Sequence, residues 1–140
     1  MSRVAVLQSI RAIQDKRTAD RRLADEQAAA KQERQAAAFR PIMDIWNTVK
    51  NIKCPNYRWH SSQEPRAPLL NQLATHSCGV ACLTFYEGGG GYGEVFQCIE
   101  NDDGQMLYRH GYRAEIHTDA AGLQEAFLTF LATRIPKEEL

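Results

Sequence analysis

Residues 3–38 contain neither proline nor glycine, and this uninterrupted stretch of 36 residues limits the possible folds more than any other feature. Most of its side chains are Ala, Arg, Gln, Glu, Lys and Leu, which favour helix. The sequence therefore predicts one long helix, about 54 Å in length at 1.5 Å per residue. Because that exceeds the width of a small globular domain, part of the helix must project or pack on another chain.

Large apolar side chains are concentrated at the start of this predicted helix. Val6, Ile10 and Ile13 are spaced by four and three residues, which places them on one face. Over residues 14–35 the only large aliphatic side chain is Leu23, so no strong coiled-coil seam continues along the helix. The helix cannot bury Val6, Ile10 and Ile13 by itself. They must therefore dock on the rest of the chain, on a second copy or on another protein.

Pro41 predicts a change in the helix. A proline breaks a helix interior but suits the first position of a new helix, so we expect a boundary or a kink near Arg40 and Pro41. The predicted domains are a helical arm over residues 1–40 and a compact domain over residues 41–140. The second domain would begin with a helix over residues 41–53. The apolar face of this helix consists of Ile42, Ile45, Trp46, Val49 and Ile52.

Beyond residue 53 the pattern becomes that of strands. Residues 79–87 and 94–100 are rich in β-branched and aromatic side chains and are separated by a glycine-rich turn, which predicts an antiparallel hairpin. Further strands are expected over residues 57–60, 105–110 and 112–117. The sheet would then have three to five strands.

A C-terminal helix is predicted over residues 119–135. Asp119 is a suitable N-cap, and the apolar side chains recur at intervals of three and four: Leu123, Ala126, Phe127, Phe130, Leu131 and Ile135. Residues 61–68 are expected to form a loop, and residues 69–75 a helical turn or irregular structure. The predicted fold class is α+β, with a small antiparallel sheet that the C-terminal helix covers.

Charge is unevenly distributed although the net charge is zero. Residues 1–53 carry eleven Lys or Arg against six Asp or Glu, and residues 54–140 carry six against eleven. The split of +5 and −5 predicts either an acidic partner for the arm, nucleic acid included, or electrostatic matching between the two parts of one molecule or of neighbouring subunits.

The sequence suggests a cytoplasmic protein. No segment approaches the roughly 18 consecutive apolar residues of a membrane-spanning helix, and the first 13 residues are expected to belong to the mature protein. Four cysteines in a chain with a hydrophobic core are expected to be reduced thiols.

The segment around His76 and Cys78 offers the densest set of reactive side chains. With Cys82 and Cys98 it could hold zinc, or a cysteine could act as a nucleophile beside His76, His110 or His117. A strand would separate Cys78 from Cys82 by about 13 Å, which argues against zinc and for cysteines that serve as small buried hydrophobic residues. No metal or other cofactor is predicted.

Two further patterns have alternative interpretations. The run of glycines at residues 88–91 could cradle a phosphate, but it joins two strands, so we interpret it as a hairpin loop in which Tyr92 is an adaptable contact. The arm could bind nucleic acid through Arg11, Arg17, Arg21 and Arg22, although acidic residues interleave with them and favour a solvated helix.

The leading hypothesis is a non-enzymatic protein-binding module. It would form a homodimer or dock on another protein, as a small regulator, inhibitor or assembly factor of the kind that phages encode. No convincing catalytic set supports an enzyme. The expected contact residues are Val6, Ile10, Ile13, Leu23, Phe39, Trp46 and Tyr92. The alternatives are a nucleic-acid-binding protein and a cysteine- or zinc-dependent enzyme.

Overall fold

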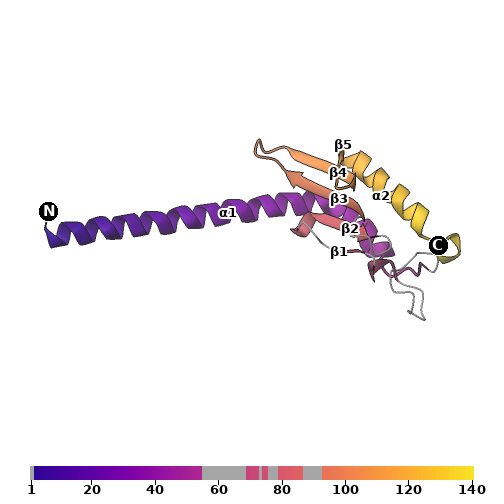
Figure 1. Cartoon of the computed structure of the whole chain (residues 1–140), viewed down its shortest axis with the longest axis horizontal. Helices are drawn as coiled ribbons and strands as arrows, with labels where there is room; N and C mark the ends of the chain where they lie inside the picture. Colours follow the sequence, from indigo (N-terminus) through magenta and orange to yellow (C-terminus); the bar gives the residue numbers. More distant parts are fainter. Residues whose placement is uncertain (1, 55–68, 73, 76–78, 87–92) are drawn as a thin grey trace. The chain divides into compact units, whose positions relative to one another are not determined.

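A computed structural model describes residues 2–54, 69–72, 74–75, 79–86 and 93–140. The chain divides into two compact units, Met1–Glu33 and Arg34–Leu140. Helix α1 (Arg3–Val49) contributes to both, and the second unit adds an antiparallel sheet and helix α2 (Ala120–Arg134) (Figure 1). The predicted α+β class, with its long N-terminal helix, is confirmed.

The helix predicted over residues 41–53 is not a separate element, because α1 runs through Pro41 without interruption. Pro41 lacks an N–H and cannot close the helical hydrogen bond to the carbonyl of Ala37, which costs about 3 kcal/mol in a helix interior. Phe39, Ile42 and Trp46 on either side of it are buried. Burial of each such side chain contributes about 1.5–3 kcal/mol, so together they offset the effect of the proline.

The second unit begins at Arg34, earlier in α1 than the boundary predicted between Arg40 and Pro41. Arg34 and Gln35 are the first side chains of α1 with a described hydrogen bond to the sheet. Arg34 binds the carboxylate of Glu100, and Gln35 Oε1 accepts a hydrogen bond from the Glu100 backbone N–H at 3.0 Å. These polar contacts lie at the start of the second unit.

The sheet is an antiparallel meander in which each strand pairs with the next along the chain. Its strands are β1 (Ala74–Thr75), β2 (Cys82–Tyr86), β3 (Gly93–Glu100), β4 (Met106–Tyr112) and β5 (Ile116–Thr118). The predicted hairpin corresponds to β2 and β3. The strand expected over residues 57–60 and the loop over residues 61–68 lie outside the described residues.

The segments before β2 and after β4 differ in detail from the prediction. The 3₁₀ turn Leu70–Gln72 matches the helical turn expected within residues 69–75, but Ala74–Thr75 forms β1. Gly79–Ala81, predicted as the start of a strand, is a second 3₁₀ turn. Between β4 and β5, Arg113 and Ala114 adopt left-handed backbone conformations with φ of 55° and 54°. They form the turn in the middle of the predicted 112–117 strand, so β5 starts only at Ile116. Because such residues rarely adopt positive φ, a turn at Arg113 and Ala114 was not predicted.

The core lies on one face of the sheet. The register places Leu83 and Phe85 of β2 on the same face as Phe96 and Cys98 of β3. Residues 39–46 of α1 and the apolar side of α2 cover this face together. The Phe85 ring lies 5.3 Å from the ring of Trp46 and 4.8 Å from that of Phe130, and the Phe96 ring lies 4.9 Å from that of Phe127. This aromatic cluster joins both helices to the sheet.

Helix α2 starts as the sequence predicts. Asp119 is the N-cap, and its Oδ1 accepts a hydrogen bond from the backbone N–H of Gly122 at 2.7 Å. The helix ends at Arg134, just before Ile135 and Pro136. Its buried residues are Leu123, Phe127, Phe130 and Leu131, all of which belong to the predicted apolar set.

Candidate functional site

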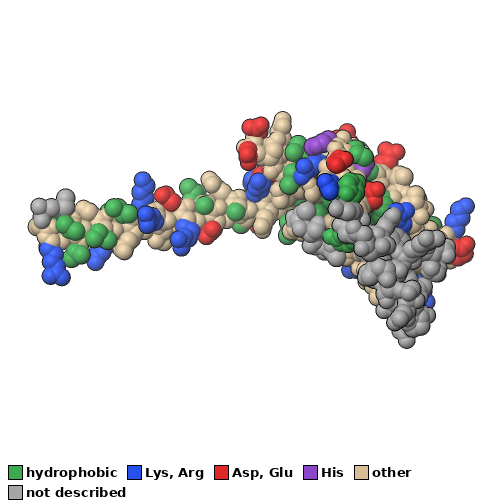
Figure 2. Space-filling model, viewed as in Figure 1, with side chains coloured by type: hydrophobic (Ala, Val, Ile, Leu, Met, Phe, Trp, Pro, Cys, Tyr) green, Lys and Arg blue, Asp and Glu red, His purple; other side chains and the backbone are tan. Residues whose placement is uncertain are grey.

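The first unit carries a stripe of exposed aliphatic side chains, which we call the apolar stripe: Val6, Ile10 and Ile13. Their side chains are 40%, 47% and 57% exposed, and the neighbouring Val4 and Leu7 are exposed too. Figure 2 shows apolar side chains at the surface near the N-terminal end of α1, with basic side chains among them. A helix by itself cannot cover one of its own faces, so this stripe is a candidate contact surface.

The other predicted contact residues do not extend this surface. Leu23 is exposed, but at 100° per residue it lies about 100° around the helix from the apolar stripe. Phe39 and Trp46 are core residues, 0% and 5% exposed, and their predicted role in contacts with a partner stays untested. Their spacing was that of a buried helix face as well as of an interface. Tyr92 lies outside the described residues.

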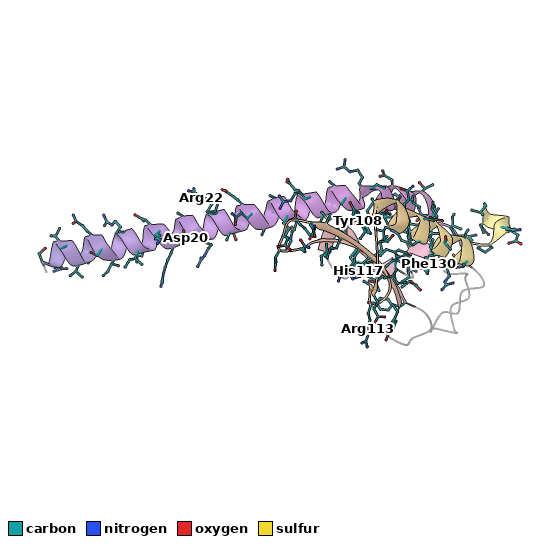
Figure 3. All side chains as sticks on the ribbon, turned by 90° about the horizontal axis from the view of Figure 1, so that it is seen from above. Asp20, Arg22, Tyr108, Arg113, His117 and Phe130 are labelled. Atoms are coloured by element: carbon teal, nitrogen blue, oxygen red, sulfur yellow. The ribbon has the colours of Figure 1, made fainter. Side chains whose placement is uncertain are left out.

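The basic residues of the first unit form two rows rather than one face. Arg11 and Arg22 share one side of the helix, and Arg17 and Arg21 share another. Asp25 lies between the rows. Asp20 and Arg22 leave the helix on different sides (Figure 3). A continuous basic surface, which would favour nucleic acid, is therefore interrupted by acidic side chains. Nucleic-acid binding by this unit stays an untested prediction.

The described cysteines do not form the metal site considered from the sequence. Cys82 pairs with Gln97, whereas Cys98 is the next residue of β3, so their side chains leave opposite faces of the sheet. They cannot bind one ion together. Among the residues that the structure describes, no three His, Cys, Asp or Glu side chains are grouped closely enough to hold a metal. His76 and Cys78 lie outside this part of the chain.

The described Cys and His pairs do not suit a cysteine nucleophile either. His110 pairs with Phe96 and so lies on the opposite face of the sheet from Cys82. Cys82 and His117 share a face, in one row that crosses β3 and β4, and three strand spacings of about 4.8 Å separate them by about 14 Å. A general base must lie within about 3 Å of the thiol.

Burial also makes two thiols unreactive. It raises the pKa of the Cys98 thiol to about 12. Burial raises the pKa of Cys54 as well, and the nearby negative charge of Glu139 adds to this effect. Because the thiolate is the nucleophile, these protonated thiols act as small hydrophobic side chains at neutral pH.

A groove between α2 and strands β3–β5 was not predicted. It has a volume of about 610 Å³ and is lined by Glu94, Phe96, His110, Thr118, Gly122, Glu125, Ala126, Thr129, Phe130, Thr133 and Arg134. The His110 ring stacks on that of Phe96, with a centroid distance of 6.4 Å and an angle of 11°, and the Arg134 guanidinium lies over the Phe130 ring. The groove brings carboxylates, the His110 imidazole, the Arg134 guanidinium and threonine hydroxyls together over aromatic rings. None of the contacts described there pairs a nucleophile with a general base.

One signal of this groove was present in the sequence. Glu125, Thr129 and Thr133 are spaced by four residues, which places a polar row along one side of α2. The other side of the groove could not be predicted, because it depends on the strand register that places Glu94, His110 and Thr118 on one face of the sheet.

Within the described part of the chain, no helix has the length and apolar character needed to cross a membrane. Comparison of the chain with protein-family models, curated proteins and solved structures finds no match.

Proposed function

We propose that the protein is a non-enzymatic interaction module that binds another polypeptide through the apolar stripe of its N-terminal helix. The observation that carries this proposal is the exposure of three large aliphatic side chains, Val6, Ile10 and Ile13, on one face of a helix. No described residue of the same unit covers them. Apolar faces of this kind are how helices dock on protein partners.

The second unit supports a scaffold role. Its thiols Cys54 and Cys98 are held protonated by burial, and Cys82 and Cys98 lie on opposite faces of the sheet. A small regulator, inhibitor or assembly factor of the type that phages encode would use the exposed face of the N-terminal helix for binding. The buried thiols of Cys54, Cys82 and Cys98 fit a protein that acts in the reducing cytoplasm.

The experiment compares the wild-type chain with the Ile10→Ser/Ile13→Ser double variant. Both substitutions are on the exposed face, so the variant keeps its fold, which circular dichroism checks. Leu128→Ser is the matched control, because Leu128 is a similarly exposed aliphatic residue, 48% exposed, on α2. We expect the wild-type and control chains to associate, with themselves in light scattering or with a captured polypeptide, and the double variant to lose that association.

The proposal fails if the double variant and the control behave alike in both assays. A comparison of variants is required because capture by the wild-type chain alone would not identify the surface responsible.

A further inference from the structure

We infer that the polypeptide bound by the apolar stripe is a second copy of this chain, with the two N-terminal helices antiparallel and Ile10 of each lying beside the partner's Ile13. This inference rests on the proposed function and adds the identity and the direction of the partner.

The apolar stripe is the centre of a longer face with spacings of three and four residues. The face consists of Arg3, Val6, Ile10, Ile13, Arg17 and Asp20. These are the positions that meet between two helices packed side by side. The apolar residues stand in the middle and the charged residues at the ends, so the direction of the partner helix decides which charges meet.

A parallel pair brings like charges together at both ends. In that arrangement each residue of the face lies beside its own copy, so Arg3 meets Arg3, Arg17 meets Arg17 and Asp20 meets Asp20. Three like-charge layers would flank the apolar layers, and like charges at such positions are destabilising.

An antiparallel pair about a twofold axis between Ile10 and Ile13 removes all three conflicts. Ile10 then lies beside the partner's Ile13 in two equivalent central layers. Val6 lies beside the partner's Arg17, whose aliphatic stem can cover it while the guanidinium reaches water. Arg3 lies beside the partner's Asp20, which gives two symmetric pairs of opposite charge. The same six residues therefore provide both the apolar contact and complementary charge.

The register is also specific. If the helices slide by one heptad in one direction, Ile10 meets the partner's Asp20 and Ile13 meets the partner's Arg17, so the isoleucines face charged groups. A slide in the other direction keeps Ile10 beside the partner's Val6 but places Ile13 beside the partner's Arg3, and the two Arg3–Asp20 pairs are lost. The favoured register overlaps residues 3–20, about 27 Å of helix. Two helices in contact over this length bury less surface than stable interfaces, which bury about 1,200–2,000 Å². The dimer is therefore weak, and its population rises with protein concentration.

Charge reversal at the ends of the face tests the direction. Arg3→Asp places two carboxylates side by side in the antiparallel dimer, and Asp20→Arg places two guanidinium groups side by side. Each single variant should weaken dimerisation by about tenfold, and the Arg3→Asp/Asp20→Arg double variant should restore it to within about threefold, as for exposed ion pairs counted twice by symmetry. In a parallel dimer like charges would meet in all of these chains, so equal dissociation constants overturn the inference.

Disulfide trapping gives an independent readout. Chains carrying Val6→Cys are mixed with chains carrying Arg17→Cys, one of the two with a tag that changes its mass, and are oxidised beside the wild-type chain as the control for native thiols. Val6 and Arg17 of two copies share a layer in the antiparallel dimer, whereas identical positions are about 16 Å apart, too far for a disulfide. We expect the mixed disulfide to predominate.

The outcomes separate the two proposals. Predominance of homodisulfides means a parallel dimer, which overturns the antiparallel arrangement and leaves docking through the apolar stripe intact. Chains that stay monomeric at every concentration overturn the second copy as the partner, while the capture comparison still decides the proposed function. Dimers that Ile10→Ser/Ile13→Ser does not weaken overturn this dimer, and if capture is also unchanged in that variant they overturn the proposed function as well.

Discussion

Arg34 donates two hydrogen bonds to the carboxylate of Glu100, from Nε to Oε1 at 2.7 Å and from Nη2 to Oε2 at 2.8 Å. The Glu100 side chain is 9% exposed, and the hydrogen bond to it raises the pKa of Arg34. With the hydrogen bond that Gln35 accepts from the Glu100 N–H, this pair fixes α1 against the end of β3 within the second unit.

Replacing Arg34 should therefore lower the stability of the second unit. Arg34→Ala leaves the nearly buried Glu100 carboxylate without this cation. The cost in free energy then includes the desolvation of that carboxylate as well as the two lost hydrogen bonds. We expect a lower thermal midpoint for Arg34→Ala than for Arg40→Ala, which removes an exposed arginine from the same helix. Equal midpoints, measured by circular dichroism, would show that the pair does not hold α1 in place.

The aromatic cluster should dominate the stability of the core. Phe96 is 1% exposed and its ring contacts those of Phe127 and Phe130 at 4.9 Å and 5.3 Å. Phe96→Ala should lower the free energy of unfolding by about 3–5 kcal/mol, since it removes apolar contacts and leaves a cavity. Leu128→Ala, on the exposed side of α2, should change it by less than about 0.5 kcal/mol. Urea unfolding measures both, and similar losses would contradict the assigned core.

The N-cap of α2 contributes a smaller amount. Asp119→Ala removes the hydrogen bond to the Gly122 N–H and should lower the free energy of unfolding by about 1 kcal/mol. Asp102→Ala, in the turn between β3 and β4, is the comparison for loss of a carboxylate. If the two substitutions have the same effect, the cap does not stabilise the helix.

Burial of Cys98 predicts a dependence of stability on alkaline pH. The pKa of its thiol rises from 9.0 to about 12 on folding, so the folded state holds the proton more tightly than the unfolded state. The stabilisation is complete below pH 9 and is lost as the pH rises towards 12. Across this range wild type should lose more stability than Cys98→Ala in urea unfolding. The two chains differ only at residue 98, so parallel losses would exclude the thiol as the cause.

Local patterns predicted most of the fold. The helix formers of residues 3–38, the β-branched and aromatic side chains of β2 and β3, and Asp119 before an apolar repeat each specify an element through neighbours in the sequence. The uninterrupted helix at Pro41 could not be predicted in this way. It depends on tertiary burial of Phe39 and Ile42, which local propensity does not contain.

The candidate site also had one part that local sequence predicted and another that depends on tertiary structure. Exposure of Val6, Ile10 and Ile13 was foreseeable, because no other apolar residues of the helix could cover them. The sequence could not show whether Trp46 is buried in the core or lies in an interface, since an apolar helix face suits both. The groove and the separation of Cys82 from Cys98 depend on strand register, which sets the face that each side chain occupies.

Binding of a second copy of the chain by the apolar stripe makes the mass of the protein in solution depend on its concentration. Its most direct test is the solution mass of wild type and of Ile10→Ser/Ile13→Ser, by light scattering over a concentration series. We expect the wild-type mass to rise from that of the 15.8 kDa monomer towards twice that value, while the variant remains a monomer. A wild-type chain that stays monomeric throughout, or a variant that associates equally well, would contradict it.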